Sequence, residues 1–179
     1  MSKYQRITAV FLFFLMTTGI CAAQSLEEVT KATNNLNIDA LAKLQIERQS
    51  KGYQVRMDIN VNNKNPQGLR LVNGDYSVMF NEQANINRMW EVGKTKIARE
   101  TLESNAVTVV RLVMNEVPVE NVIKMINIIG DPDAPRKVTL EGTSGVELQV
   151  GRGWGSEPDR RFKIELSWTP EFQRGVLMK

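Results

Sequence analysis

Apolar and polar residues alternate along much of the chain, which is the pattern of β-strands with one buried face and one solvated face. The alternation is most regular from Tyr53 to Val61, where every second residue is apolar. A similar alternation predicts a strand from Leu36 to Glu47, with Leu41 as its one break. Ala, Leu, Lys and Gln in that stretch favour helix, but the period decides which side chains can be buried. The first half of the chain therefore predicts two antiparallel strands.

A hairpin is predicted at Asn73-Gly74. Pro66 ends the preceding strand, because proline cannot donate to a strand ladder. Alternating apolar positions then approach the Asn-Gly pair and leave it again: Leu69, Leu71, Tyr76, Val78 and Phe80. A type I′ turn needs a positive φ at both central residues, and Asn-Gly satisfies this requirement.

The second half of the chain predicts further strands. Residues 81–105 predict one or two irregular strands joined at Gly93. The segment AVTVVRLVMN predicts a strand with a β-bulge between Val109 and Val110, where the apolar phase slips. Residues 138–150 and 162–168 alternate again and predict two long closing strands.

Two helices are predicted, one at the start and one between late strands. Ser25 and Glu28 have the capping-box spacing, which predicts a short helix within residues 24–35. Pro118 suits a helix start, and Gly130 and Pro132 end the second helix. Its predicted buried stripe consists of Val119, Val122, Ile123, Ile126 and Ile129, while Ile128 falls on the polar side. A helix of about 12 residues is marginal alone in water, so packing against the sheet must hold it.

About seven strands, turns rich in Gly and Pro, and a single helix between late strands predict a mainly β fold. The expected architecture is a fibronectin- or immunoglobulin-like β-sandwich over residues 36–170. Residues 24–35 would precede this single domain, and residues 171–179 would form a C-terminal tail.

The N-terminus has the three parts of a secretory signal peptide, residues 1–23. Lys3 and Arg6 precede an apolar run, and small residues lead to a cleavage site between Ala23 and Gln24. The run is shorter than the roughly 20 residues of a membrane span, so no stable transmembrane span is expected after processing. A periplasmic or secreted location follows. Lipidation at Cys21 is an alternative. It is disfavoured because Ile20 stands before Cys21, where lipoprotein signals have a small residue.

Removing the signal peptide changes the charge. The chain has 23 basic and 20 acidic residues, and loss of two basic residues leaves 21 against 20, a net charge of +1. The charge therefore gives no support for nucleic-acid binding. The chain has no His, and its one Cys leaves with the signal. His-Cys zinc sites, imidazole bases and thiol nucleophiles are excluded, and we expect neither an enzyme nor a cofactor nor a metal site.

One segment offers a candidate interaction loop. The sequence GRGWGSEPDRR, residues 151–161, joins two strands and is longer than a minimal hairpin turn. It carries Arg152, Trp154, Arg160 and Arg161, and Trp and Arg dominate interface hot spots. The loop could contact an envelope protein or an anionic envelope surface. In the alternative interpretation, the Trp closes the end of the sandwich and the arginines are solvated.

Several motifs together resemble the type 2 late-embryogenesis-abundant family, also called the water-stress and hypersensitive-response domain. The matching positions are Asn65-Pro66, followed by Gln in place of the family's Asn, then Gly74-Asp75-Tyr76, and VTLEGT with Gly142. The Pro-Gly-rich turn usual in the family is replaced by ARETLESNA. The resemblance covers roughly Leu36 to Trp168. It implies a fibronectin-like sandwich carrying a helix, without known catalytic residues, and protection from dehydration stress or binding.

These observations predict a non-enzymatic exported domain that acts in the cell envelope by binding or stress protection. One alternative is a structural subunit of an envelope secretion or pilus machine, which would recruit a neighbour through an exposed edge strand. Another alternative is a carrier whose sandwich opens around an apolar ligand such as a lipid.

Overall fold

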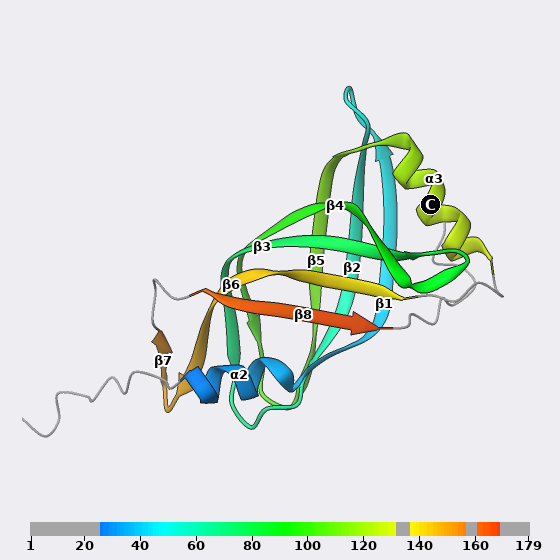
Figure 1. The fold of residues 1–179 in the computed structure, drawn as a ribbon. Coiled ribbons are helices and arrows are strands. Elements are labelled where there is room, and N and C mark those ends of the chain that lie inside the picture. The colour runs from blue at the N-terminus through cyan, green and yellow to red at the C-terminus, as the bar shows by residue number, and fades with distance from the viewer. Residues whose placement is uncertain (1–25, 132–136, 157–160, 169–179) are drawn as a thin grey trace, which may run out of the picture.

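A computed structural model describes residues 26–131, 137–156 and 161–168. Two antiparallel sheets pack face to face (Figure 1). The first sheet has the order β1-β2-β5, with β1 Leu36–Arg48, β2 Tyr53–Asn63 and β5 Ala106–Val117. The second has the order β4-β3-β6-β7, with β3 Leu69–Glu82, β4 Asn85–Leu102, β6 Val138–Val150 and β7 Gly153–Ser156. Strand β8, Phe162–Trp168, also pairs with β6. The mainly β class and the sandwich are confirmed. The signal peptide, its cleavage site and Cys21 lie outside the described residues.

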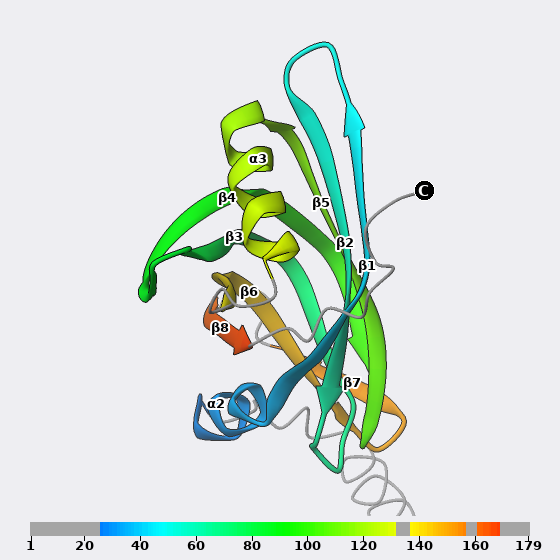
Figure 2. The ribbon, with the colours of Figure 1, turned by 90° about the vertical axis from the view of Figure 1, so that its right-hand side faces the viewer.

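The two helices lie at opposite ends of the sandwich. In both views α2, Leu26–Asn34, is at the lower end, and α3, Val119–Gly130, is at the upper end (Figures 1 and 2). Strand β4 runs beside β5, and β8 lies beside β1, so the two sheets approach each other along both margins. The predicted helix between late strands is confirmed as α3.

The interior of the sandwich is filled by side chains from the inner faces of both sheets. The largest fully buried side chains from the strands are Val55, Met57, Ile59, Leu69, Val78, Phe80, Leu102, Leu112, Met114, Leu140 and Leu148. A core filled in this way resembles the interior of an ordinary domain, where few voids exceed a water molecule.

Strand β2 shows the predicted alternation, but the alternation predicted for β1 is wrong at residues 40–42, and Leu44 and Ile46 again pack on the core side as predicted. Register shifts against β2 occur between Ile38 and Ala40 and again between Leu41 and Lys43. These bulges turn Leu41 into the core, where it is buried. The residue that broke the sequence pattern is thus a core residue, because each bulge moves the following side chains to the other face.

The hairpin predicted at Asn73-Gly74 is wrong, because β3 runs straight through these two residues. Asn73 has φ of 50°, and the register against β6 shifts between Val72 and Asp75. Asn73 therefore occupies a β-bulge, which can require a residue with a positive φ, as the predicted type I′ turn does. The chain reverses later, in a turn at residues 83–84 between β3 and β4.

Strands β4 and β5 differ from prediction in where their irregularities lie. Strand β4 is one strand of 18 residues, with a register shift beside Gly93. The bulge predicted between Val109 and Val110 is wrong, since the pairing with β2 is regular there. Val109 instead points to solvent and is 56% exposed. The irregularity of β5 lies at its end, where Glu116 has φ of 55°.

The predicted N-terminal helix is confirmed as α2, and it is part of the domain. Val29 and Ala32 are buried. The Nδ2 of Asn65 donates a hydrogen bond to the backbone oxygen of Ala32 at 2.8 Å. Residues of this segment thus pack on the sandwich and are held by its turns.

The buried side of α3 differs from the predicted stripe. The buried residues are Val122, Met125, Ile128 and Ile129. Val119, Ile123 and Ile126 belong to the predicted stripe, but they are 48%, 52% and 38% exposed. Successive helix residues are separated by about 100°, and the apolar residues of α3 cover more of its circumference than one stripe. The sheet selects one part of this apolar arc and leaves the rest in solvent.

Candidate functional site

The predicted interaction loop is mostly a tight hairpin. Val150 pairs with Gly153 across the two-residue turn Gly151-Arg152, where Gly151 has φ of 60°. Trp154 lies in β7 opposite Gln149. The long loop expected between two strands is therefore wrong for residues 151–156. Residues 157–160, which include Arg160, lie outside the described residues.

Trp154 covers an arginine of β3, which lies on the other side of β6 from β7. The guanidinium carbon of Arg70 lies 3.8 Å from the Trp154 ring centroid. Arg70 also forms an ion pair with Glu147 at 2.9 Å. Stacking on a guanidinium that is fixed by a carboxylate gives this half-buried Trp a packing role on the sheet surface.

The structure does not bring Arg152 and Arg161 together. Arg161 donates to the backbone oxygen of Thr143 at 3.0 Å and pairs with Asp75 at 3.3 Å. Phe162, the residue after Arg161, pairs with Ser144 of β6, whereas Gly153, the residue after Arg152, pairs with Val150 of β6. Six positions along one strand correspond to about 20 Å. Arg152 and Arg161 therefore lie at separate places along β6.

The positions matched to the family motif are structural. Asn65 is buried in a hydrogen-bond network, and Pro66 is exposed in the turn after β2. The Tyr76 ring covers Gly74 and Gly142, since a Cβ at either glycine would overlap Tyr76 atoms. Burial raises the pKa of Tyr76, with smaller opposing contributions from Ser144 and Arg161.

A shallow depression of about 310 Å³ lies on the outer face of the second sheet. Its lining residues are Asp75, Tyr76, Ser77, Lys94, Thr95, Lys96, Glu141, Gly142 and Thr143. Two of its carboxylates are in ion pairs, Asp75 with Lys96 at 3.6 Å and Glu141 with Lys163 at 3.1 Å. Such exposed pairs are typical of a solvated sheet face and contribute little energy.

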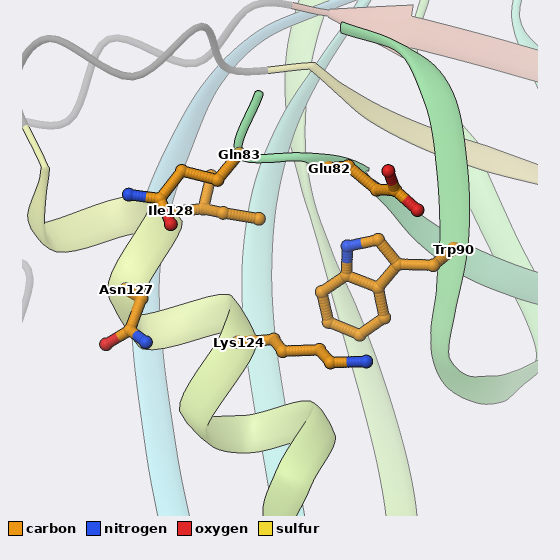
Figure 3. Close-up of a pocket in the computed structure, with 6 residues that line it drawn as sticks. All are labelled: Glu82, Gln83, Trp90, Lys124, Asn127 and Ile128. Carbon is orange, nitrogen blue, oxygen red and sulfur yellow. The ribbon is translucent and has the colours of Figure 1, made fainter. Parts of the chain in front are cut away.

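A smaller pocket lies between α3 and the β3–β4 hairpin (Figure 3). Its volume is about 240 Å³, and it is lined by Glu82, Gln83, Trp90, Lys124, Asn127 and Ile128. We call it the Trp90 pocket. Figure 3 shows the Ile128 side chain extending toward the Trp90 ring, while the Lys124 side chain runs along that ring.

Trp90 is held in one orientation. Its indole Nε1 donates to the backbone oxygen of Asn81 at 3.1 Å. Its ring centroid lies 6.3 Å from that of Phe80, at an interplanar angle of 39°. The Nζ of Lys124 lies 5.6 Å from the Trp90 centroid, within the range of a cation–π contact.

Hydrogen bonds connect the two walls of the Trp90 pocket. The Nδ2 of Asn121 on α3 donates to the backbone oxygens of Glu91 and Val92 on β4, at 3.2 Å each. At the other end of the helix, the Nε2 of Gln83 donates to Asp131 at 3.1 Å. These contacts join the helix to the hairpin at both ends of the pocket.

The pattern of apolar and polar residues did not predict the Trp90 pocket. Trp90 falls in the least regular stretch of the pattern, and its partners on α3 are more than 30 residues away. The one available signal was a pair of polar residues, Lys124 and Asn127, spaced by three on the helix. That spacing places them on one side but does not say what faces them.

The exposed apolar side of α3 is a separate feature. Val119, Ile123 and Ile126 have the spacing i, i+4, i+7, which places them on one side of the helix. We call this set the α3 stripe. The helix period directs Ile128 to a different side, toward Trp90. Two exposed carboxylates, Glu116 and Glu120, flank the N-terminal end of the α3 stripe in the sequence.

The part of the chain that the structure describes contains neither a metal-binding group of side chains nor a membrane-spanning helix. No group of three or more Cys, Asp and Glu side chains in that part of the chain is placed to hold a metal ion. No helix within residues 26–131, 137–156 and 161–168 has the length and apolar character needed to cross a membrane.

No protein-family model matches the chain, and no curated protein matches it. Three solved structures are similar to it at low identity. A protein from Archaeoglobus fulgidus has 11% identity and a TM-score of 0.33, over 76% of this chain and 100% of that one. A protein from Arabidopsis thaliana has 16% identity and a TM-score of 0.39, over 76% and 84%. The structural genomics target SoR45 has 13% identity and a TM-score of 0.35, over 81% and 92%. With TM-scores below 0.5, these similarities assign neither a family nor a function.

Proposed function

We propose that the protein is an exported, non-catalytic binding domain that docks a partner protein in the cell envelope through the α3 stripe. The observation that carries this proposal is the division of α3 into two apolar sides. Its core side is buried, while Val119, Ile123 and Ile126 are 48%, 52% and 38% exposed.

A helix needs only one apolar side to pack on a sheet. Three further aliphatic side chains in one row beside the buried side lose the favourable transfer of about 25 cal/mol for each Å² that stays in water. Isolated exposed aliphatic residues are common, but a row at i, i+4, i+7 on one helix matches the surface of a helix that contacts a partner. Figure 1 places α3 at the outer end of the sandwich, where a second protein can reach it.

The charges beside the α3 stripe favour a protein over an anionic lipid surface. Glu116 and Glu120 are exposed next to Val119 in the sequence. An anionic surface would repel both carboxylates. A protein segment with apolar side chains flanked by Lys or Arg would complement them, and rim charges of this kind mainly raise the association rate.

The setting of this function comes from the sequence. The signal-peptide pattern places the domain in the periplasm or outside the cell, and the resemblance to type 2 late-embryogenesis-abundant proteins adds envelope stress as its context. The filled core favours a surface role over transport of a lipid inside the sandwich.

The test is site-specific photo-crosslinking in envelope fractions of cells that export the full chain. A photoreactive residue at Ile123 should give one protein adduct, and the same residue at the exposed Lys163 of β8 should give none. A photoreactive residue at Ile126 should give the same adduct, which should disappear in the double variant Val119→Asn, Ile123→Asn and decrease in Glu116→Gln, Glu120→Gln. Because these positions are exposed, the unfolding midpoint of each variant should stay near that of the parent.

Other outcomes would contradict the proposal. A lipid adduct at position 123, together with binding to anionic vesicles that the double variant loses, would replace the partner protein with a membrane surface. Equal adducts from positions 123 and 163, or none from either, would remove α3 as the contact surface.

A further inference from the structure

The Trp90 pocket lies on a different side of α3 from the α3 stripe, and the proposed docking does not use it. We infer that this pocket binds a neutral sugar ring, with the Trp90 indole as the apolar floor and polar side chains of the hairpin and helix around it. This inference concerns a second ligand and stands independently of the partner protein.

The size and the apolar part of the pocket fit one pyranose ring. Its volume of about 240 Å³ accommodates a single ring with its hydroxyl groups. Among the described residues, Trp90 and Ile128 are the apolar residues that line it. A sugar ring has a face of C–H groups that packs on an aromatic ring, and Trp offers the largest such surface together with a polar edge. The indole N–H is already bonded to Asn81, and the Nζ of Lys124 lies 5.6 Å from the ring centroid, so a sugar would contact the ring face beside the Lys124 ammonium.

The polar part of the pocket suits hydroxyl groups. Lys124 offers donors, Asn127 offers both donors and acceptors, and Glu82 offers acceptors. Arg88 engages the Oε1 of Glu82 at 3.2 Å, which partly neutralises that carboxylate. A hydroxyl both donates and accepts, so neighbouring hydroxyls of one ring can pair with a carboxylate and an ammonium together.

Other ligand classes fit less well. Four of the six lining residues are polar, which disfavours an alkyl chain. Glu82 is the one carboxylate among the described residues of the lining, whereas Ca²⁺ takes six to eight oxygen ligands. An anion would meet Lys124 but also Glu82. A quaternary ammonium would compete with Lys124, whose Nζ lies 5.6 Å from the Trp90 centroid.

The walls of the pocket are fixed before binding. Asn121 ties α3 to β4, and Gln83 ties the hairpin to Asp131 at the end of the helix. A ligand therefore loses little affinity to ordering of the site. A single ring of about 12 heavy atoms in such a site has an expected dissociation constant of roughly 1 mM, and longer glycans bind more tightly if they reach beyond the pocket.

The experiment is a titration of the ¹⁵N-labelled exported chain, followed by two-dimensional NMR. Glucose and N-acetylglucosamine are the probes, and glycine betaine, inorganic phosphate and CaCl₂ are the comparators. The Trp90 indole N–H and the Asn127 side-chain amide should shift with the sugars. Trp90→Ala should abolish the saturable shifts, and Asn127→Ala should weaken binding about 3- to 10-fold.

Two control variants separate this site from the rest of the protein. Trp154→Ala removes a Trp on β7 and should leave sugar binding unchanged. The double variant Val119→Asn, Ile123→Asn should also bind sugar normally, whatever happens to the partner protein. If Trp90→Ala reduces stability, Asn127→Ala at an exposed position still tests the site.

The inference is overturned if neither sugar shifts the Trp90 or Asn127 signals at concentrations up to about 50 mM. It is also overturned if betaine, phosphate or Ca²⁺ shifts them at lower concentration than either sugar. Sugar binding that persists unchanged in both Trp90→Ala and Asn127→Ala would place the ligand elsewhere.

Discussion

One side-chain oxygen of Asn63 holds Asn65 in place. The Oδ1 of Asn63 accepts the backbone N–H of Asn65 at 3.1 Å and its Nδ2 at 2.7 Å. The Nδ2 of Asn63 donates to three backbone oxygens, those of Gln67, Leu102 and Glu103. Both Asn side chains are buried. The pair therefore joins the turn after β2 to the end of β4 and, through Asn65, to α2.

Replacing Asn63 with Ala should destabilise the protein by about 2–4 kcal/mol, because several buried polar groups would lose their partners together. Urea unfolding followed by circular dichroism measures this loss. The matched control is Asn62→Ala, which removes one exposed hydrogen bond to Asp39 and should change stability by less than about 0.5 kcal/mol. Equal effects of the two substitutions would show that the buried network contributes little.

Replacing Gly142 with Ala should destabilise the protein by about 3 kcal/mol. A Cβ at Gly142 would overlap the backbone oxygen of Asp75 and would lie 2.7 Å from the Cδ1 of Tyr76. The backbone of β3 cannot give way without breaking its ladder. At Gly153 the nearest atom to a new Cβ is 3.9 Å away, so Gly153→Ala is the matched control and should change the unfolding midpoint little. A neutral Gly142→Ala would mean that β3 and β6 separate easily.

The ion pair between Asp58 and Arg111 predicts a specific loss of stability in acid. The Nε and Nη2 of Arg111 donate to the two carboxylate oxygens at 2.7 and 3.1 Å. These hydrogen bonds lower the pKa of Asp58 from its usual value of 3.8, against burial, which raises it. A lowered folded-state pKa contributes stability that is fully present above the unfolded pKa and is lost as the pH falls through the folded pKa.

The advantage of the parent over Asp58→Asn should therefore be constant above about pH 5 and should shrink as the pH falls below about 4. Urea midpoints measured across this range test the sign. Arg111→Met removes the cause of the shift from the other side, so its curve should follow that of Asp58→Asn. A parent advantage that grows on acidification would contradict the assignment.

The alternation of apolar and polar residues predicted the class of fold, because a strand with one buried face has an apolar residue at every second position, as in β2. It did not predict the bulges of β1 and β3, since a bulge depends on which residues of two strands pair. Asn73-Gly74 illustrates the difference. The left-handed φ that the pair suggests is present at Asn73, but β6 and β4 continue beside β3, and the chain does not reverse.

The candidate site was harder to predict than the fold. The loop of residues 151–161 was predicted as an interaction site because it contains Trp and Arg. Pairing with β6 folds its first part into a hairpin, and Trp154 stacks on Arg70. The Trp90 pocket depends on the packing of α3 against a distant hairpin. No short segment of the sequence contains that relationship.

The helix α3 allows the sharpest test of the packing. Its apolar residues are Val119, Val122, Ile123, Met125, Ile126, Ile128 and Ile129. They surround most of the helix, so the sequence alone could not select the buried side. Ile128 is 3% exposed and Ile123 is 52% exposed. Both are isoleucines within one helix, so Ile→Ala changes helix propensity equally at the two positions.

Ile128→Ala should therefore destabilise the protein by about 2–4 kcal/mol through lost burial and a cavity next to Trp90. Ile123→Ala should be neutral or slightly stabilising, by about 0.4 kcal/mol, because Ala favours helix and little burial is lost. Urea unfolding at constant slope gives both values, and Ile128→Val should lie between, at about 1 kcal/mol. A larger loss at Ile123 than at Ile128 would reverse the two sides of α3, and with them the surface that the proposed partner would contact.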